Sequence, residues 1–565
     1  MKRFYITALI LLPCLCPLAW SYTNPILYAD YSDPDAIRVG KDYYMTASSF
    51  NCSPGLPILH STNLVDWEII SYALSYSIPG GAPLSADGKN YIGSAKRPSP
   101  VQHGNQVWAP SIRYHKKMFY IVWGDPDVGI YQVHSSSVYG PWSEPVLLMA
   151  GKGFIDACPL WDNDGKCYIV HAFAGTRAGF KSVICVMETD ESLTKVITPS
   201  QVVYDGHDDA PTSEGPKFYK YGGYYYIFHP AGGVATGWQQ VLRAENVYGP
   251  YECRRVLAQG TTDINGPHQG AWVTTTKGEE MFLHFQDVGP LGRILHLQPM
   301  SWHNGWPVIG SDKDGDGCGE PVMISNVKEK GTAQNNTTDA DNRPANILLT
   351  ADGLSLGLQW QWQAQPDARW FYVNKATGSV RLYSVSQTYA DGSLRESDDN
   401  LWHRKNLLLM KPDTANETFT ARVRLVPDSR YSGERGGIVV MGQAYAALLL
   451  DNTPQGMYLR QVENEKAHLD GKETAWAELP ANRQEYWLRV RLMTTNEQLQ
   501  GTTDKQVIAE FEYSVDGTVF MSVGRPFAVR PGQWIGAKVG LFCSRPPRAI
   551  NDGGWLEVKE FVVEK

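Results

Sequence analysis

Two patterns of hydrophobic and polar positions divide this chain. In the first, from about residue 24 to 326, short runs of aromatic and β-branched residues alternate with turns rich in glycine and aspartate, as in β-strands joined by tight turns. Five such runs lie at residues 43–47, 118–123, 167–171, 224–228 and 281–285. This part of the chain is therefore predicted to be all-β and to contain a repeated unit.

A second motif returns between these runs. Residues 138–142 read Val-Tyr-Gly-Pro-Trp, residues 247–251 read Val-Tyr-Gly-Pro-Tyr, and residues 63–67 hold a degenerate copy. Repeats of roughly 50 to 75 residues with about four strands each are typical of propeller blades, which bury their faces against neighbouring blades. We predict a five-bladed β-propeller over residues 22–326. A large sandwich is the alternative, but it gives no reason for a motif to return at blade-sized intervals.

The pattern changes beyond the repeats. Residues 327–346 are polar and are predicted to be a linker. Strict alternation of apolar and polar positions follows, for example at residues 419–425 and 486–492, and predicts an antiparallel, jelly-roll-like β-sandwich over residues 347–565. Two domains also suit the length of 565 residues, because single hydrophobic cores stop growing near ~250–300 residues.

The N-terminus has the three parts of a secretory signal peptide, which we place at residues 1–21. Basic residues at positions 2 and 3 precede an apolar run over residues 4–20, and small residues flank the end of that run. A lipoprotein is the alternative because of Cys14, but Pro13 stands where a small residue is expected. We expect export to the periplasm, with the cell surface as the second possibility.

Composition and charge exclude several classes of protein. The net charge is -8 with both signs interspersed, so no basic stripe is available to neutralise nucleic-acid phosphates. No segment after the signal peptide is long and apolar enough to span a bilayer. The nine cysteines leave seven after cleavage, scattered and without Cys-x-x-Cys spacing, so neither a disulfide framework nor a zinc site is indicated.

Three carboxylates lie in turn-like segments that suit acid–base catalysis. Glu214 lies between small residues and a Gly-Pro turn, before an aromatic strand whose low-dielectric surroundings would raise a carboxyl pKa. Asp33 precedes Pro34, which we expect to hold it extended, and Asp156 follows a glycine-rich turn and precedes an apolar strand. Taken singly, Glu214 could be an exposed strand-end residue and Asp33 a turn cap.

The predicted propeller brings these three residues together. Its inner strands converge on one axis, so residues far apart in sequence meet at one mouth. Three carboxylates in one pocket repel, which raises the pKa of at least one of them. Glycoside hydrolysis needs such a set, with one acid to protonate the leaving oxygen and one carboxylate to activate water.

Taken in order, these motifs resemble glycoside hydrolase family 43 over nearly the whole chain. The segments that carry the resemblance are residues 24–34, 108–110, 154–156 and 213–216, together with 358–362 of the appended sandwich. The resemblance implies an inverting exo-mechanism with Asp33 as general base, Glu214 as general acid, and Asp156 tuning and orienting Glu214. The chain has Asp35 where the family often has serine, so Asp35 is the alternative base, although on a strand it should point the other way.

The resemblance also implies residues that contact substrate. Trp108 would stack on a sugar ring, Phe50 would form an aromatic wall, and Trp534 would close the pocket from a C-terminal loop. Arg293 would bond a sugar hydroxyl and hold Asp156 ionised. The alternatives are core positions for Trp108 and Phe50, a surface salt bridge for Arg293, and a sandwich that only shields a propeller face or binds polysaccharide by itself.

No cofactor is expected to be required. His268 resembles a histidine near the propeller axis that meets a hydrated calcium ion in some relatives, but one imidazole is thin evidence for a cation that prefers oxygen ligands. A hydrogen-bonded structural histidine is favoured over a calcium ligand there, and His268 is also counted among the candidate substrate-binding residues. Residues 312–317 imitate the start of a calcium loop, but Met323 stands where the loop needs glutamate, so an acidic surface turn is predicted.

The sequence thus predicts an exported enzyme that removes terminal non-reducing α-L-arabinofuranose from arabinoxylan, arabinan or xyloglucan side chains. A β-D-xylosidase acting on xylo-oligosaccharides is the alternative, and an open groove would indicate an endo-arabinanase. A non-catalytic glycan-binding propeller is the alternative from another class. The partners expected are plant polysaccharides or oligosaccharides, with no obligate protein partner.

Overall fold

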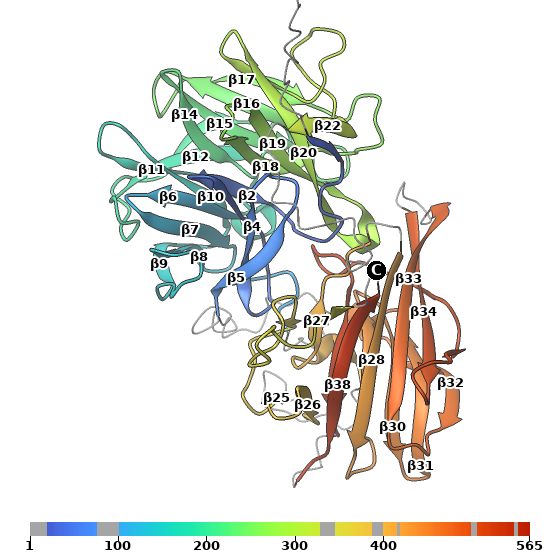
Figure 1. The fold of residues 1–565 in the computed structure, drawn as a ribbon. Coiled ribbons are helices and arrows are strands. Elements are labelled where there is room, and N and C mark those ends of the chain that lie inside the picture. Colours follow the sequence, from blue (N-terminus) through green and yellow to red (C-terminus); the bar gives the residue numbers. More distant parts are fainter. Residues whose placement is uncertain are drawn as a thin grey trace, which may run out of the picture.

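The computed structural model describes residues 20–75, 101–327, 345–386, 399–414, 418–498, 505–546 and 552–564. The predicted signal peptide and linker lie almost entirely outside these ranges. The described residues form two β-domains, a propeller followed by a sandwich (Figure 1). Among them, no helix has both the length and the apolar character needed to cross a membrane.

Five four-stranded antiparallel sheets confirm the predicted five-bladed propeller. The aromatic runs form the second strand of every blade, and the repeated Val-Tyr-Gly-Pro motif lies between the third and fourth strands of the second and fourth blades. In chain order the strands are β2 (Asp35–Val39), β3 (Asp42–Thr46), β4 (Gly55–Ser61) and β5 (Glu68–Leu74); β6 (Pro110–His115), β7 (Met118–Asp125), β8 (Gly129–Ser135) and β9 (Val146–Ala150); β10 (Phe154–Trp161), β11 (Cys167–Phe173), β12 (Val183–Thr189) and β13 (Gln201–Asp205); β14 (Lys217–Tyr221), β15 (Tyr224–Ala231), β16 (Trp238–Ala244) and β17 (Glu252–Leu257); β18 (His268–Thr274), β19 (Glu280–Asp287), β20 (Arg293–His303) and β21 (Trp306–Ile309).

The first strands of the blades are the inner ones. Strand β2 contacts β6 and β18, and β10 contacts β6 and β14. Outside the blades, β1 (Trp20–Thr23) pairs with β22 (Ile324–Val327), and Leu27 bridges to Leu295 on β20. The N-terminal segment therefore runs along the fifth blade before it enters the first, which ties the two ends of the ring together.

The sandwich consists of a nine-stranded and a seven-stranded sheet. Strands of the first sheet are β23 (Ala345–Asn346), β25 (Phe371–Asn374), β26 (Ser379–Tyr383), β28 (Thr418–Asp428), β33 (Tyr486–Gln498), β34 (Lys505–Ser514), β35 (Met521–Ser522), β36 (Phe527–Ala528) and β38 (Trp555–Glu564). Strands of the second are β24 (Gln361–Trp362), β27 (Leu408–Met410), β29 (Arg435–Met441), β30 (Tyr445–Thr453), β31 (Gly456–Asn464), β32 (Thr474–Pro480) and β37 (Lys538–Ser544). Buried and less buried positions alternate along β28, as the sequence pattern predicts, and the main core lies between the sheets.

The few helical segments are short. They are α1 (Gly175–Ala178) and the 3-10 turns η1 (Gly289–Leu291), η2 (Leu401–His403) and η3 (Ala467–Leu469). The chain is thus all-β in both of its domains, as predicted.

The two domains meet through backbone pairing and a ring stack. Ser53 pairs with Trp362, and the N–H of Ala537 donates to the Pro290 carbonyl at 2.8 Å. The rings of His103 and Trp402 stack with centroids 3.5 Å apart. Contacts of this kind fix the sandwich against one end of the propeller.

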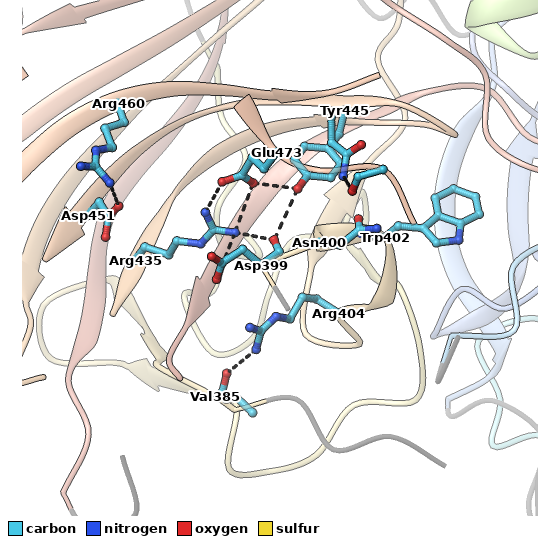
Figure 2. Close-up of polar contacts among 12 residues, drawn as sticks. Val385, Asp399, Asn400, Trp402, Arg404, Arg435, Tyr445, Asp451, Arg460 and Glu473 are labelled. Carbon is cyan, nitrogen blue, oxygen red and sulfur yellow. Dashed lines mark hydrogen bonds and ion pairs between the residues drawn. The ribbon is translucent and has the colours of Figure 1, made fainter. Parts of the chain in front are cut away.

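A buried polar network in the sandwich positions Trp402 (Figure 2). Arg435, which is 6% exposed, forms an ion pair with Glu473 and donates to the Asp399 carbonyl. The Tyr445 hydroxyl donates to Glu473 at 2.7 Å. Because buried ionic groups are costly unless paired, these contacts hold the segment that begins at residue 399 and carries Trp402 toward the propeller.

Candidate active site

The three predicted carboxylates all lie at the N-terminal ends of inner strands. Asp33 precedes β2 by two residues, Asp156 is the third residue of β10, and Glu214 precedes β14 by three residues. Equivalent ends of inner strands open at the same mouth of a propeller. The N–H of Gly215, next to Glu214, donates to Asp156, and the charges of Asp156 and Asp33 both raise the pKa of Glu214, so the three groups lie near one another.

Asp33 accepts two sets of hydrogen bonds and is 8% exposed. The Ser48 hydroxyl donates to it at 2.6 Å and the Arg293 guanidinium at 3.3 Å. Its φ of +55° is left-handed, so the expectation of an extended residue before Pro34 is wrong. Aspartate enters this region more readily than most residues, and the turn directs its side chain into the site.

Asp35 points elsewhere, as expected for a neighbour on a strand. It is fully buried, and its carboxylate pairs with Arg113 at 2.6 Å. Because its carboxylate is held by Arg113 on β6 of the second blade, Asp35 cannot also point toward the site around Asp33. The geometry therefore favours Asp33 over Asp35 as the candidate base.

Asp156 is aimed by a β-bulge. The register between β10 and β11 shifts between Ile155 and Cys158, and Asp156 has a φ of +60°; bulges of this kind re-aim side chains beside active sites. Its carboxylate accepts the N–H of Gly215 at 2.7 Å. Burial raises the pKa of Asp156 to about 7, the Gly215 N–H opposes that rise, and the charge of Asp33 adds to it.

Glu214 is the second carboxyl of this group whose pKa is raised. Burial raises the pKa of Glu214 from 4.5 to about 8, and the charges of Asp156 and Asp33 contribute next. The adjacent Gly215 has a φ of +61°, and a Cβ there would lie 2.7 Å from the side chain of Gln269, so only glycine fits this turn. A carboxyl that stays protonated near neutral pH can donate a proton to a leaving group.

Arg293, the first residue of β20, contacts a different carboxylate from the one expected. Its hydrogen bonds go to Asp33, and a second carboxylate, Asp287, lies 3.7 Å from its Nε. The expected role of holding Asp156 ionised is thus not carried by a direct contact. A buried guanidinium between two carboxylates holds Asp33 in place.

His268, the first residue of β18, lies 3.5 Å from Glu214, measured from Nε2 to Oε1. Burial lowers the pKa of His268 to about 3, so the imidazole is neutral. Neither ring nitrogen has a hydrogen-bond partner among the described residues, so the expected hydrogen-bonded structural histidine is not observed. One imidazole beside one carboxyl does not make the set of oxygen ligands that calcium prefers.

The acidic turn at residues 312–317 is a separate feature. Asp312, Asp314 and Asp316 are the one group of possible metal ligands found in the described ranges. Their carboxylates accept backbone N–H groups of their own loop, such as Gly315 to Asp312 at 2.8 Å. This geometry is that of a surface turn, and nothing in it points to a ligand.

The two predicted tryptophans meet across the domain boundary. Trp108 and Trp534 pack edge to face with centroids 6.3 Å apart, and Trp534 is 46% exposed. Gly104, with a φ of +71°, permits this approach, because a Cβ there would lie 2.5 Å from the side chain of Gln533. Trp534 and Arg293 line one cavity of about 230 Å³, and Arg293 in turn bonds Asp33, so the sandwich loop lies beside the residue that holds this carboxylate.

Phe50 is buried on the propeller side. It has a φ of +50° and is 3% exposed, and its N–H donates to the Val107 carbonyl at 2.8 Å. Its ring belongs to none of the seven hydrophobic clusters of the described residues. The predicted role of Phe50 as a wall of the sugar pocket stays a prediction.

Sequence reasoning missed several residues that shape the site. Ser48 bonds Asp33, the Asp30 carboxylate accepts the N–H of Arg293 at 2.9 Å, and Asp287 lies beside the Arg293 guanidinium. Asp30 is only three residues before Asp33, but the other two come from different segments. No local pattern links them to Asp33, so only the folded ring could identify them.

A carboxyl whose pKa is raised and a second carboxylate, both at the ends of inner propeller strands, are the pair of groups that glycoside hydrolysis uses. The family model "Glycosyl hydrolases family 43" matches residues 22–307, and the model "Beta xylosidase C-terminal Concanavalin A-like domain" matches residues 352–564. A protein of Xylanibacter ruminicola named "Putative beta-xylosidase" is 34% identical over 92% of this chain and 86% of its own length. The chain belongs to glycoside hydrolase family 43 and is a glycosidase.

Two further comparisons show other proteins to which the chain is similar. The non-reducing end alpha-L-arabinofuranosidase BoGH43B of Bacteroides ovatus is 28% identical over 74% of this chain and 73% of its own length. A solved structure of a GH43 protein from Bacillus licheniformis has a TM-score of 0.75 at 23% identity, covering 97% of this chain and 100% of that chain. The second comparison shows that propeller and sandwich share that protein's fold.

Proposed function

We propose that the protein is an inverting, exo-acting β-D-xylosidase that releases terminal xylose from xylo-oligosaccharides. The observation that carries the reaction is the pairing in one site of Glu214, whose pKa is raised to about 8, with Asp33, held by Ser48 and Arg293. One group is set up to give a proton and the other only accepts hydrogen bonds. This division of labour is what inversion at a glycosidic carbon requires.

In the proposed reaction, Glu214 protonates the glycosidic oxygen while Asp33 takes a proton from the attacking water. Asp156 binds the backbone beside Glu214 through the Gly215 N–H at 2.7 Å and raises the pKa of Glu214 by its charge. Arg293 keeps the Asp33 carboxylate in place from the fifth blade. Burial of the acid makes each of these electrostatic effects larger than it would be in water.

The sandwich loop supports an exo mode of action. Trp534 packs against Trp108 and lines the same cavity as Arg293, which narrows the mouth on one side. A narrowed cavity suits one terminal sugar, whereas an open groove would suit internal cleavage. The two rings offer faces on which a pyranose or furanose could pack.

We propose xylose as the preferred sugar, whereas the sequence alone favoured arabinofuranose. The Xylanibacter ruminicola relative, named "Putative beta-xylosidase", matches 92% of this chain at 34% identity, and the sandwich matches a model described by β-xylosidases. These similarities favour xylose. Terminal α-L-arabinofuranose is the second candidate, because the Bacteroides ovatus relative, at 28% identity, is named for that activity.

Hydrolysis of defined substrates tests the proposal. The purified protein is incubated with aryl β-D-xylopyranoside, aryl α-L-arabinofuranoside and reduced xylo-oligosaccharides, and the configuration of the first-formed sugar is followed by NMR. We expect xylose to leave from the non-reducing end with inverted configuration. Release of arabinose alone would establish the second candidate, and retained configuration would refute the assigned roles of Asp33 and Glu214.

We also propose that the enzyme is exported to the periplasm, on the strength of the N-terminal pattern of residues 1–21. Expression of the full chain in a bacterial host followed by N-terminal sequencing tests this. A mature N-terminus near residue 22 in the periplasmic fraction is expected, and an intact Met1 in the cytoplasm would contradict it.

A further inference from the structure

A buried lysine of the sandwich contacts a buried cysteine of the propeller. Lys538, the first residue of β37, places its Nζ 2.8 Å from the Sγ of Cys52, which lies between β3 and β4. Both residues are 3% exposed. The contact joins positions 486 residues apart in the chain, so it is made only when the two domains are docked.

This lysine has an unusual environment. Burying an amino group away from water is costly unless oxygen atoms or a carboxylate receive its hydrogen bonds. The buried Lys217 meets that condition, because its Nζ donates to the Pro110 carbonyl at 2.7 Å and to the Ser111 hydroxyl at 2.9 Å. For the Lys538 amino group, the Cys52 sulfur is the one hydrogen-bond partner found in the described part of the chain.

The pair also borders an internal cavity. A cavity of about 20 Å³ is lined by Cys52, Lys538, Asn51 and His103, with Trp402 and Ile535 from the sandwich. A space of this size holds a single small molecule such as water. Dioxygen, which is small and uncharged, can reach such an internal space and would meet the sulfur and the nitrogen together.

We propose that Cys52 and Lys538 are a modification site, at which oxidation by dioxygen joins them through one oxygen atom as an S–O–N bridge. The S–H bond and one N–H bond break, and S–O and O–N bonds form. One oxygen atom of dioxygen stays in the bridge, and the other leaves as water with the two hydrogens. Sulfur and nitrogen each give up two electrons, which dioxygen takes up. Adding a thiol reductant in excess reverses the link, as it does for other reversible cysteine oxidations.

The bridge would tie the propeller segment beside Phe50 to the sandwich segment beside Trp534. Cys52 lies two residues after Phe50, and Lys538 lies four residues after Trp534. A covalent tie between segments so far apart in sequence restricts the unfolded chain strongly. The link would therefore hold the sandwich loop on the propeller without touching the three carboxylates.

Mass spectrometry of the wild-type protein tests this directly. One sample is kept in reductant and the other is equilibrated with air, and both are digested after the remaining thiols are alkylated. We expect the oxidised sample to yield a peptide pair joined at Cys52 and Lys538, heavier than the sum of the peptides by one oxygen atom and lighter by two hydrogen atoms. We expect the pair to disappear on reduction and the oxidised protein to unfold at a temperature higher by a few degrees.

The chain contains its own matched control. The Cys158 Sγ also lies 2.8 Å from a nitrogen, Nη2 of Arg113, but a guanidinium lacks the basic amine that the reaction consumes. Cys158 should therefore stay alkylatable in both samples. The Lys538→Arg and Cys52→Ser variants should each lose the linked pair, and the wild-type comparison stands even where a variant fails to fold.

Three results would overturn the proposal. The first is a Cys52 that remains fully alkylatable after exposure to air. The second is oxidation of Cys52 to a sulfinic or sulfonic acid with Lys538 unmodified. The third is a linked pair that has lost two hydrogens without gaining oxygen, because that product is a direct S–N bond.

Discussion

Removing the charge of Asp156 should shift the pH at which the enzyme stops working. Its carboxylate is the largest charge contribution to the raised pKa of Glu214, second only to burial. The Asp156→Asn substitution removes that charge and keeps an oxygen that can accept the Gly215 N–H now bonded at 2.7 Å. The variant therefore isolates charge from geometry.

The size of the shift follows from the pKa of Glu214. Its rise from 4.5 to about 8 corresponds to about 5 kcal/mol, at about 1.4 kcal/mol per pH unit. Burial contributes most, followed by the charge of Asp156 and then that of Asp33. Removing one nearby like charge typically lowers a carboxyl pKa by on the order of 1 unit, or ~1.4 kcal/mol. We therefore expect the pKa of Glu214 in the variant to lie about 1 unit below that of the wild type.

The assay is kcat/KM as a function of pH, whose basic limb reports the acid of the free enzyme. In the wild type, activity should fall as the pH rises through about 8, because Glu214 then loses its proton. In Asp156→Asn the same limb should lie about 1 pH unit lower. An unchanged basic limb, with activity reduced equally at all pH values, would show that Asp156 does not tune Glu214.

Further predictions concern neighbouring residues. Asp33→Asn should abolish turnover of every substrate while the protein still folds, because Arg293 keeps Asp287 as a second carboxylate at 3.7 Å. By contrast, Asp35→Asn removes the ion-pair partner of the buried Arg113, now at 2.6 Å, and should lower the free energy of unfolding by about 3 kcal/mol. Turnover per folded molecule should be retained. Loss of turnover in Asp35→Asn with activity retained in Asp33→Asn would make Asp35 the general base. Gly104 has a φ of +71°, and a Cβ there would lie 2.5 Å from the Gln533 side chain. Gly104→Ala should therefore displace the Trp534 loop and raise KM about tenfold, or ~1.4 kcal/mol. An unchanged KM would show that Trp534 does not contact the substrate. Glu214 has a raised folded-state pKa, so its stabilising contribution is complete below about pH 4.5 and is lost as the pH rises through about 8. Glu214→Gln should therefore have the same unfolding free energy as the wild type at pH 4 and exceed it by about 2 kcal/mol at pH 9. This is less than the free energy that the whole pKa shift would give, because the side chain is 29% exposed. Equal stability at pH 9 would contradict the raised pKa of Glu214.

The fold was predictable because its units repeat. The aromatic second strands and the Val-Tyr-Gly-Pro turns recur in the sequence, and a unit that cannot bury its faces alone must stack on copies of itself. The three carboxylates were predictable for the same reason, since a ring of equivalent inner strands brings their ends together. Alternation along residues 419–425 likewise fixed which side of that sandwich strand is buried.

The parts that failed depend on local backbone and on contacts between distant segments. Asp33 adopts a left-handed φ although the proline after it favours extended backbone; the bonds from Ser48 and Arg293 stabilise the turn, and neither is visible in the sequence around it. The sequence predicted Asp156 as the partner of Arg293, but the partner is Asp33, because it depends on how the fifth blade meets the first. No described residue hydrogen-bonds the imidazole of His268, contrary to the expectation for a buried histidine, and its place beside Glu214 is set by the ring as a whole.

The most direct test of the account is the leaving-group dependence of Glu214→Gln on a series of aryl β-D-xylosides. The account holds that Glu214 gives its proton to the leaving oxygen, so the variant should lose little activity on the most acidic phenols and progressively more on the least acidic ones. A uniform loss across the series would contradict the assignment of Glu214 as the general acid.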